Sequence, residues 1–375
     1  MRIVMFYHSL ISDWNHGNAH FLRGITTELM ARGHDVTVYE QRNAWSVRNL
    51  IASYGEPALD GFRSVYPGLK SVRYELETID LDNELRGADL VIVHEWNHPE
   101  LVRRVGQYRE EIGDFVLFFH DTHHRAVTAP EELARLDLHA YDGVLAFGNA
   151  VAEKYRQQGW ADRTWTWHEA ADTRVFTGNG RPDAAGADFE GDLVWIGNWG
   201  DGERSDEIRE FLLRPVKDLG LRARIYGVRY PESALEELAA ANIEYGGWLP
   251  NYEAPRVFSR FRMTVHVPRR PYAMALPGIP TIRVFEALSC KIPLVSAFWA
   301  DVEHLFTPGE DYRVARDGAE MTRHLVALMD DPLRARELAH HGHHTILSRH
   351  TCAHRVGELL AIYAQVAEGT REAVA

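Results

Sequence analysis

Short apolar runs alternate with amphipathic helical patterns along most of this chain. In the first 176 residues the apolar runs have the length and buried character of strands, and helical periodicity fills the segments between them. The predicted strands are Arg2–Tyr7, Val36–Tyr39, Ala88–Val93, Phe115–Phe119 and Gly143–Phe147, with helices at Ala19–Ala31, Pro99–Tyr108 and Asn149–Gln158. This alternation is typical of a parallel sheet covered by helices on both faces.

A second series of the same kind follows residues 177–191, a segment rich in Gly, Ala and Asp that lacks periodicity and reads as a linker. Its predicted strands are Asp192–Ile196, Arg222–Tyr226, Arg262–Val267, Ile292–Val295 and Tyr312–Val314, and residues 332–367 are predicted to be helical throughout. With 375 residues the chain exceeds one ordinary core. We therefore expect an α/β protein of two Rossmann-like doubly wound domains, 1–176 and 192–349, facing a cleft.

Composition narrows the class of protein. The formal net charge is −13, which argues against nucleic acid as a partner, and no apolar run approaches the roughly 18 residues of a membrane span. Only Cys290 and Cys352 occur, and the first residues run directly into a strand pattern without the features of a signal peptide. We expect a cytoplasmic protein without a disulfide framework.

Ligands of parallel α/β sheets bind beyond the carboxyl ends of the strands, so the strand ends are where a site is expected. The first strand leads into a polar loop that lacks the G-x-G-x-x-G turn of dinucleotide-binding domains. On the acceptor side of a site, Gly17 and Asn18 could let a substrate approach the backbone, and Asp13 and His16 could act as acid or base. The alternative is a polar loop in which Asn18 caps the next helix.

The strand ending at Phe119 is followed by a cluster of polar residues. His120 and Asp121 are placed to contact a sugar, and we take both as candidate catalytic residues. Three imidazoles between residues 120 and 124 also suggest zinc, but no HExxH or cysteine-rich spacing accompanies them. We expect no metal, and a plain surface loop remains the alternative.

The second series opens with a glycine-rich turn that begins at Gly197 and leads into a helix. Glycines permit close approach of a phosphate, and Arg204 is placed to neutralise a diphosphate leaving group. The alternative is a tight surface turn with an exposed arginine. Further along, the backbone at Gly247 could read a nucleobase edge, and Trp248 could stack on the base or simply pack.

The most informative segment is 278–296, which predicts a Pro-bounded loop, a short amphipathic helix and a buried strand. Backbone N–H groups of the first helical turn, near Pro280, Thr281 and Arg283, could hold an anion together with the helix dipole. Glu286 lies one turn further on and could accept hydrogen bonds from sugar hydroxyls. A nucleoside diphosphate carries both kinds of group.

Four segments resemble the GT-B glycosyltransferases of the family 4 type, and in particular their spore-maturation (CgeB-type) branch: GNWGDGER, RVFEALSCKIPLVS, LFTPGEDYRVA and HTCAHRVGELL. Residues 172–176 also resemble the DTxxF segment before the linker of these enzymes. The resemblance implies that Glu286 binds the ribose hydroxyls and that Arg204 faces the diphosphate. It further implies that Gly197 and Asn198 form the phosphate turn, that His120 contacts the donor sugar, and that a C-terminal helix, 350–375, packs back toward the first domain.

The activity implied by this resemblance is transfer of a hexose-type sugar from a nucleotide donor, UDP- or GDP-linked, with retention and without a metal or cofactor. The acceptor, whether small molecule, glycan or protein, is not specified. An inverting enzyme would instead need a base such as Asp13, His16 or His120. The competing hypotheses are a nucleotide-sugar epimerase or hydrolase on the same fold and a non-catalytic module that binds glycan or nucleotide.

The sequence departs from the family pattern at two positions. Gly278 stands where a second glutamate is usual, so the contact with the donor sugar must come from another group. Lys291 stands where a turn glycine is common, so we expect that turn to be strained or to change type.

Overall fold

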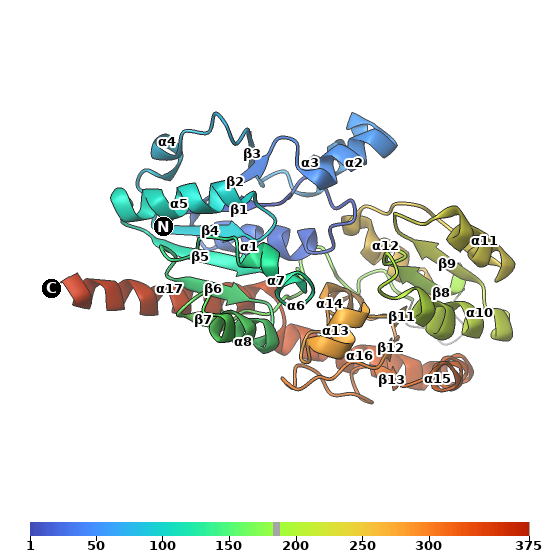
Figure 1. The fold of residues 1–375 in the computed structure, drawn as a ribbon. Helices are drawn as coiled ribbons and strands as arrows, with labels where there is room; N and C mark the ends of the chain where they lie inside the picture. Colours follow the sequence, from blue (N-terminus) through green and yellow to red (C-terminus); the bar gives the residue numbers. More distant parts are fainter. Residues whose placement is uncertain (183–187, 375) are drawn as a thin grey trace. The chain divides into compact units, whose positions relative to one another are not determined.

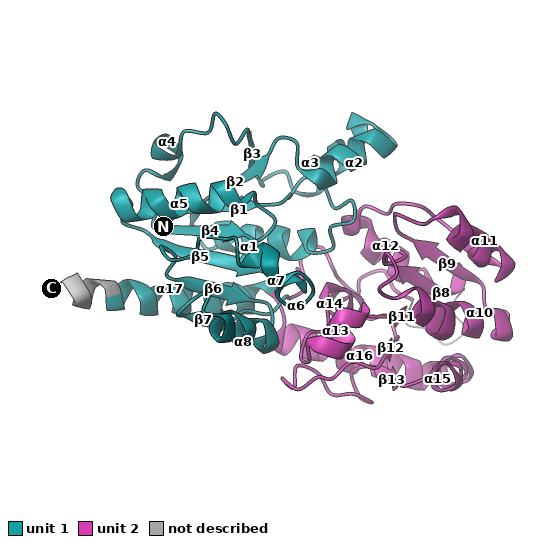
Figure 2. Ribbon diagram, in the orientation of Figure 1, with its two compact units in different colours: residues 1–169, 352–375 teal, residues 170–351 magenta. Residues whose placement is uncertain are grey.

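The computed structural model describes residues 1–182 and 188–374, which form two compact α/β units (Figures 1 and 2). Unit 1 comprises residues 1–169 and 352–375, and unit 2 comprises residues 170–351. Each unit is built on its own parallel sheet, and each is described here by itself.

The sheet of unit 1 has seven parallel strands in the order β3-β2-β1-β4-β5-β6-β7. The strands are β1 (Arg2–Tyr7), β2 (Asp35–Gln41), β3 (Ser71–Tyr74), β4 (Leu90–His94), β5 (Val116–Asp121), β6 (Gly143–Ala146) and β7 (Thr164–Thr166). The central strands β4 and β5 are buried along their whole length, which explains their continuous apolar sequences. The strand order reverses between β1 and β4, so this is a doubly wound sheet with its switch point there.

Helices connect these strands, and the last helix of the chain also belongs to unit 1. They are α1 (Ala19–Ala31), α2 (Trp45–Tyr54), η1 (Glu56–Leu59), α3 (Asp60–Val65), α4 (Leu81–Leu85), α5 (Pro99–Glu111), α6 (Arg125–Thr128), α7 (Pro130–Leu133), α8 (Asn149–Gln158) and α17 (Cys352–Val374). Helix α17 packs against α1, and the buried indole of Trp167 donates a hydrogen bond to the Arg355 carbonyl at 2.8 Å. The predicted return of the C-terminal helix to the first domain is confirmed.

The sheet of unit 2 has six parallel strands in the order β10-β9-β8-β11-β12-β13. They are β8 (Gly191–Ile196), β9 (Ala223–Tyr226), β10 (Ile243–Tyr245), β11 (Phe261–His266), β12 (Leu294–Ala297) and β13 (Arg313–Ala315). The order reverses between β8 and β11, which repeats the arrangement of unit 1. The predicted fold class, two doubly wound parallel sheets, is confirmed.

The helices of unit 2 are short around the sheet and long near the end of the unit. They are α9 (Ser205–Ile208), the π-helical η2 (Arg209–Leu213), α10 (Arg214–Leu219), α11 (Glu232–Ala240), η3 (Asn251–Glu253), α12 (Ala254–Phe258), α13 (Arg270–Ala275), α14 (Ile282–Ser289), α15 (Gly318–Asp330) and α16 (Pro332–Arg349). Within residues 1–182 and 188–374, no helix is long and apolar enough to cross a membrane.

The C-terminal helical region differs from the sequence prediction. We expected one helical stretch over 332–367, but α16 ends at Arg349 and α17 begins at Cys352. Between them, the His350 carbonyl accepts a hydrogen bond from the Ala171 N–H at 2.9 Å, and Thr351 forms an isolated β-bridge with Ala171. This extended pairing replaces a helical turn where the chain passes from unit 2 to unit 1.

The compact units also divide at positions other than the predicted domain boundaries. The domains expected at 1–176, 192–349 and 350–375 would place residues 170–176 with the first domain, whereas these residues pack within unit 2. There the Phe176 carbonyl accepts a hydrogen bond from Ser289 Oγ at 2.5 Å. Of the expected linker, 177–191, residues 183–187 lie outside the described part of the chain.

The packing of α17 generates a stability prediction. Leu359 lies on α17 and is fully buried, so Leu359→Ala should lower the free energy of unfolding of unit 1 by about 2–5 kcal/mol. Leu347 on α16 is 47% exposed, and Leu347→Ala serves as the matched control, with an expected change within about 0.5 kcal/mol. Urea denaturation of the whole chain measures both. Equal small losses would mean that α17 contributes little to unit 1.

Candidate active site

The glycine turn after β8 is packed too closely for side chains. A Cβ on Gly227 would lie 1.9 Å from the Gly197 carbonyl oxygen, and a Cβ on Gly200, where φ is +92°, would lie 2.5 Å from the Cγ of Arg204. The Gly197 N–H donates to the Tyr226 carbonyl at 2.8 Å. These glycines therefore bring the turn against the neighbouring strand end and leave room for the Arg204 side chain.

Arg204 is a half-buried cation rather than an exposed surface residue. Its guanidinium donates to the Val267 carbonyl at 3.0 Å and to the backbone and side-chain oxygens of Asn198 at 2.7 and 2.8 Å. It lies 5.1 Å from the Trp195 ring centroid. Across residues 1–182 and 188–374 no carboxylate pairs with it, and its Nε has no hydrogen-bond partner. The guanidinium of Arg204 is therefore fixed between the turn after β8 and the carboxyl end of β11.

A second guanidinium makes the same region more positive. Arg269 follows β11, pairs with Glu203 at 2.5 Å and donates to Asn198 Oδ1 at 3.1 Å. Burial, together with the nearby Arg269, lowers the pKa of Arg204 to about 9. An anion bound here would relieve the repulsion between the two cations.

The N-terminus of α14 begins at a strained residue. Thr281, its N-cap, has φ +61° and ψ 157°, a region in which β-branched residues are outliers. The Thr281 hydroxyl lies 3.2 Å from His266 Nε2, and Nδ1 of the same ring lies 2.9 Å from Ser296 Oγ. This network holds the first turn of α14 beside the carboxyl end of β11, with Pro280 buried just before it.

Glu286 is fully buried within α14, on the turn that follows the predicted anion site. Its Oε1 accepts a hydrogen bond from Asn251 Nδ2 at 2.7 Å, and its Oε2 pairs with the Arg283 guanidinium. The carboxylate is thus held in one orientation by a partner on each oxygen.

Gly247 and Trp248 follow strand β10, and Gly247 contacts the turn that follows β9. Gly247 has φ +69°, and its carbonyl accepts a hydrogen bond from the Gly227 N–H at 2.8 Å. Trp248 is half-buried. The Gly247 carbonyl therefore supports the turn after β9, and a role in reading a nucleobase stays a prediction.

The family pattern has a glutamate at the position of Gly278. Here the side chain of another acid, Glu303, fills the space that a Cβ at this position would need. Gly278 has φ +92°, its N–H donates to the Ala300 carbonyl at 2.7 Å, and a Cβ there would lie 2.5 Å from Glu303 Oε1. The Glu303 carboxylate is thus beside the Gly278 backbone. Lys291 has φ +54°, so its turn keeps the left-handed conformation, and the expected strain is present.

In unit 1, His120 lies at the carboxyl end of β5 and is completely buried. Its ring centroid is 4.8 Å from that of Trp167 and 5.3 Å from that of His94. Within the described part of the chain neither ring nitrogen has a hydrogen-bond partner. Burial lowers the pKa of His120 to about 3, so the imidazole is neutral at pH 7.

Asp121 follows His120 but is engaged on both oxygens. It accepts hydrogen bonds from the His123 N–H at 2.9 Å and the Tyr155 hydroxyl at 2.7 Å, and burial raises its pKa. Glu95 lies nearby, and burial followed by repulsion from Asp121 raises the pKa of Glu95 to about 8. Asp121 and Glu95 are therefore two neighbouring carboxyl groups that are both buried within unit 1.

Of the residues predicted for the acceptor side, the loop after β1 places His16 near His94, which in turn contacts His120, whereas Asp13 is engaged elsewhere. His16 is buried, its ring is 6.5 Å from that of His94, and its Nε2 has no partner among residues 1–182 and 188–374. The Asp13 carboxylate is held instead in a buried ion pair with Arg23 at 2.9 Å. An ion pair of this kind favours a structural role for Asp13.

Gly17 and Asn18 lead into α1. The Gly17 carbonyl accepts a hydrogen bond from the His20 N–H at 3.4 Å, as part of the first turn. Asn18 occupies the N-cap position, but its side chain does not cap the helix and donates to Glu169 at 2.7 Å. The described ranges also contain no group of three or more His, Cys, Asp or Glu side chains arranged to hold a metal ion.

Several residues of the unit 2 site carried no usable sequence signal. Asn251 lies in the 3₁₀ turn η3, 35 residues before Glu286, and nothing in its neighbourhood marks it as a partner of that carboxylate. His266 sits at the end of β11, and this strand end, which already indicated that Arg269 lines the site, is the one pattern that could have identified His266. Glu303 becomes visible only through its contact with Gly278.

The burial of His120 predicts an acid-sensitive unit 1. The unfolded pKa is about 6.5 and the folded pKa about 3, so the neutral form is stabilised, and stability is lost as pH falls below 6.5. Between pH 6.5 and 5 this one group should remove about 2 kcal/mol. Replacing it by His120→Phe should make the free energy of unfolding from urea titrations less dependent on pH over this interval. Parallel pH profiles for the two proteins would contradict the assignment.

Comparisons with known proteins support the same class of fold. Residues 204–361, less than half of the chain, match a family model described as glycosyl transferase-like. No curated protein sequence matches significantly. Among solved structures, a sucrose-phosphate synthase from Thermosynechococcus elongatus superposes with a TM-score of 0.65 at 13% identity, covering 98% of this chain and 100% of that one.

Two further structures have the same architecture. Anabaena Alr3699/HepE in complex with UDP and glucose matches with a TM-score of 0.68 at 12% identity, covering 97% of this chain and 99% of that one. T4 phage BGT in complex with UDP and Mn²⁺ matches with a TM-score of 0.58 at 12% identity, covering 100% and 99%. At these identities the likeness shows the fold, and the enzyme class comes from the family model. The chain is a glycosyltransferase of the GT-B fold, the class whose sugar donors are nucleotide-linked.

Proposed function

We propose that this protein transfers a hexose-type sugar from a UDP- or GDP-linked donor to an acceptor hydroxyl, without a metal and with retention of the anomeric configuration. The observation that carries the donor assignment is the half-buried Arg204 guanidinium, which has no carboxylate partner in residues 1–182 and 188–374. Retention and the CgeB-type branch rest on the sequence resemblance alone.

A buried charge is costly unless it is paired, because it gives up its hydration. Arg204 donates only to neutral oxygens, and Arg269 adds a second positive charge beside Asn198. A diphosphate would supply the missing negative charge. The backbone N–H groups of the first turn of α14, next to the strained Thr281, offer donors of the right kind for the same group.

Glu286 is the proposed contact for the ribose. Its two oxygens are oriented by Asn251 and Arg283, and a carboxylate is a strong acceptor for the hydroxyls of a ribose. The distance along α14 from the N-terminus to Glu286 is about one turn. This spacing suits a nucleoside diphosphate whose phosphates lie at the helix start.

The proposed catalytic contribution of this region is electrostatic. Cleavage of the anomeric bond places negative charge on the leaving diphosphate, and Arg204 and the α14 amides are fixed donors for that charge. Removing one such donor typically costs about 3 kcal/mol of transition-state stabilisation. We place Gly197 and Asn198 in the same turn as supports of Arg204 and of the phosphate, with Gly247 and Trp248 on the nucleobase side.

For unit 1 we propose that His120 contacts the donor sugar and that His16 lies on the acceptor side. Both imidazoles have ring nitrogens without a partner among the described residues, so each can bond a hydroxyl. Burial lowers the pKa of both rings, which makes them weak bases and fits hydroxyl binding better than proton removal. Asp13 and Asp121, held by Arg23 and Tyr155, are proposed as positioning residues.

The Glu303 carboxylate is our candidate for the donor-sugar contact that Gly278 cannot make, because it lies against the Gly278 backbone. The UDP complexes of the Anabaena and T4 phage proteins support a uridine donor over a guanosine donor. The net charge of −13 argues against DNA as the acceptor.

The ribose assignment is tested with Glu286→Gln, which keeps the shape of the side chain and its contact with Asn251. The dissociation constant for UDP or GDP, measured by calorimetry, should rise at least tenfold, because charge-assisted hydrogen bonds are each worth about 1.5–3 kcal/mol. Glu236→Gln, on the exposed face of α11, is the control and should bind like the wild type. An unchanged affinity in a folded Glu286→Gln variant would refute the role.

The catalytic assignment is tested with Arg204→Lys, which keeps the charge but loses the forked donor geometry. Turnover of UDP-glucose with a panel of acceptors should fall about a hundredfold, while the exposed control Arg209→Lys retains activity. Proton NMR of the product reports the anomeric configuration. A wild-type protein that binds the donor but never transfers or isomerises the sugar would identify a binding module instead.

A further inference from the structure

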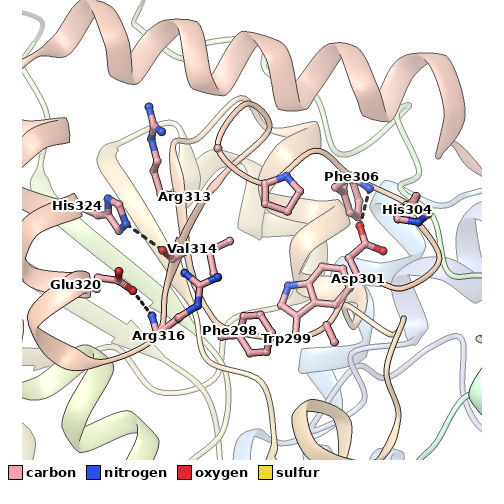
Figure 3. A pocket seen from close by; sticks show the side chains of 13 residues that line it. Phe298, Trp299, Asp301, His304, Phe306, Arg313, Val314, Arg316, Glu320 and His324 are labelled. Carbon is pink, nitrogen blue, oxygen red and sulfur yellow. Dashed lines mark hydrogen bonds between the residues drawn. The ribbon is translucent and has the colours of Figure 1, made fainter.

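A pocket lies in unit 2 and is lined by residues other than those assigned to the donor, although its lining residues Asp301 and His304 flank Glu303 in the chain. It has a volume of about 530 Å³ and is lined by residues that follow β12 and β13 and by the start of α15 (Figure 3). None of its lining residues belongs to the set proposed for the nucleotide sugar. Its size lies within the 300–1,000 Å³ range typical of sites for small organic ligands.

The wall of this pocket contains a buried donor without an acceptor. Trp299 is 4% exposed, and in residues 1–182 and 188–374 no group accepts a hydrogen bond from its indole Nε1. The ring is held parallel to Tyr312, with centroids 6.2 Å apart. Figure 3 shows the indole nitrogen pointing into the space between Phe298, Arg316 and the loop above. Buried polar groups normally have partners, so this one marks a place for a ligand atom.

Two cations of the lining also lack counterions. The Arg313 and Arg316 guanidinium groups form no ion pair with a carboxylate within the described ranges of the chain. Arg316 lies 5.7 Å over the ring of Phe298, which is 47% exposed at the pocket. The pocket therefore combines positive charge with an open aromatic face.

The carboxylates of the lining accept hydrogen bonds from the backbone. The two Asp301 oxygens accept hydrogen bonds from the Leu305 and Phe306 N–H groups at 3.0 and 2.9 Å, and Glu320 accepts one from the Arg316 N–H at 2.7 Å. In contrast, the Trp299 N–H has no acceptor among the described residues, and the Arg316 guanidinium has no carboxylate partner there. A ligand that satisfies them must offer oxygen acceptors and negative charge.

We propose that this pocket binds an oxyanion-bearing saccharide, a sugar that carries a carboxylate or a phosphate, at a site separate from the donor nucleotide. The oxyanion is held by Arg316, a ring or hydroxyl oxygen accepts from Trp299, and the C–H face of the sugar packs on Phe298. The pocket volume accommodates a sugar together with its charged group, whereas a bare anion would leave Phe298 without a role.

The test uses the whole chain and four probes in calorimetric titrations: glucuronic acid, glucose 6-phosphate, glucose and inorganic phosphate. At least one of the two charged sugars should bind saturably and more tightly than either glucose or phosphate, and the comparison between them identifies the oxyanion. Arg316→Gln should weaken that binding at least tenfold, which corresponds to about 1.4 kcal/mol. Trp299→Phe, which removes only the N–H donor and keeps an aromatic ring, should weaken it several-fold.

Arg214→Gln, an exposed arginine on α10, is the matched control and should bind the charged sugar like the wild type. UDP titrated into each variant separates this site from the donor site, because its affinity should not change in any of them. The proposal is overturned if neither charged sugar binds, if glucose or phosphate binds equally well, or if Arg316→Gln and Trp299→Phe leave the affinity intact.

Discussion

The half-buried guanidinium of Arg204 is the constraint on which the unit 2 site depends. Its hydrogen bonds to Asn198 and to the Val267 carbonyl tie the turn after β8 to the carboxyl end of β11. The glycines at 197, 200 and 227 are required because the turn and this side chain leave no space for a Cβ. A cation held in this way, with Arg269 beside it, gives the strand ends a positive field before any ligand arrives.

Helix α14 supplies the second half of the arrangement. Its apolar face is buried against unit 2, which fixes the helix, and the network of Thr281, His266 and Ser296 fixes its first turn. The strained backbone of Thr281 persists because these contacts hold it. One turn further on, Glu286 is oriented by Asn251 and Arg283, so the carboxylate is positioned in advance and little order must be created on binding.

The sequence predicted the parts of this structure that depend on local pattern. Buried central strands such as β4 and β5 read as continuous apolar runs, whereas the edge strands β3 and β7 are only partly buried and gave no signal. Arg204 and Glu286 could be located because each lies at a strand end or on a short amphipathic helix. Asn251 could not, because its partner is distant in sequence, and the break at His350 contains neither Pro nor Gly.

The central claim is that one nucleoside diphosphate bridges Arg204, the start of α14 and Glu286. A crystal structure of the protein with UDP tests it most directly. We predict β-phosphate oxygens within about 2.7–3.2 Å of Arg204 or the first-turn amides of α14, and ribose hydroxyls bonded to Glu286. UDP bound elsewhere in unit 2, with no ribose hydroxyl bonded to the Glu286 carboxylate, would contradict it.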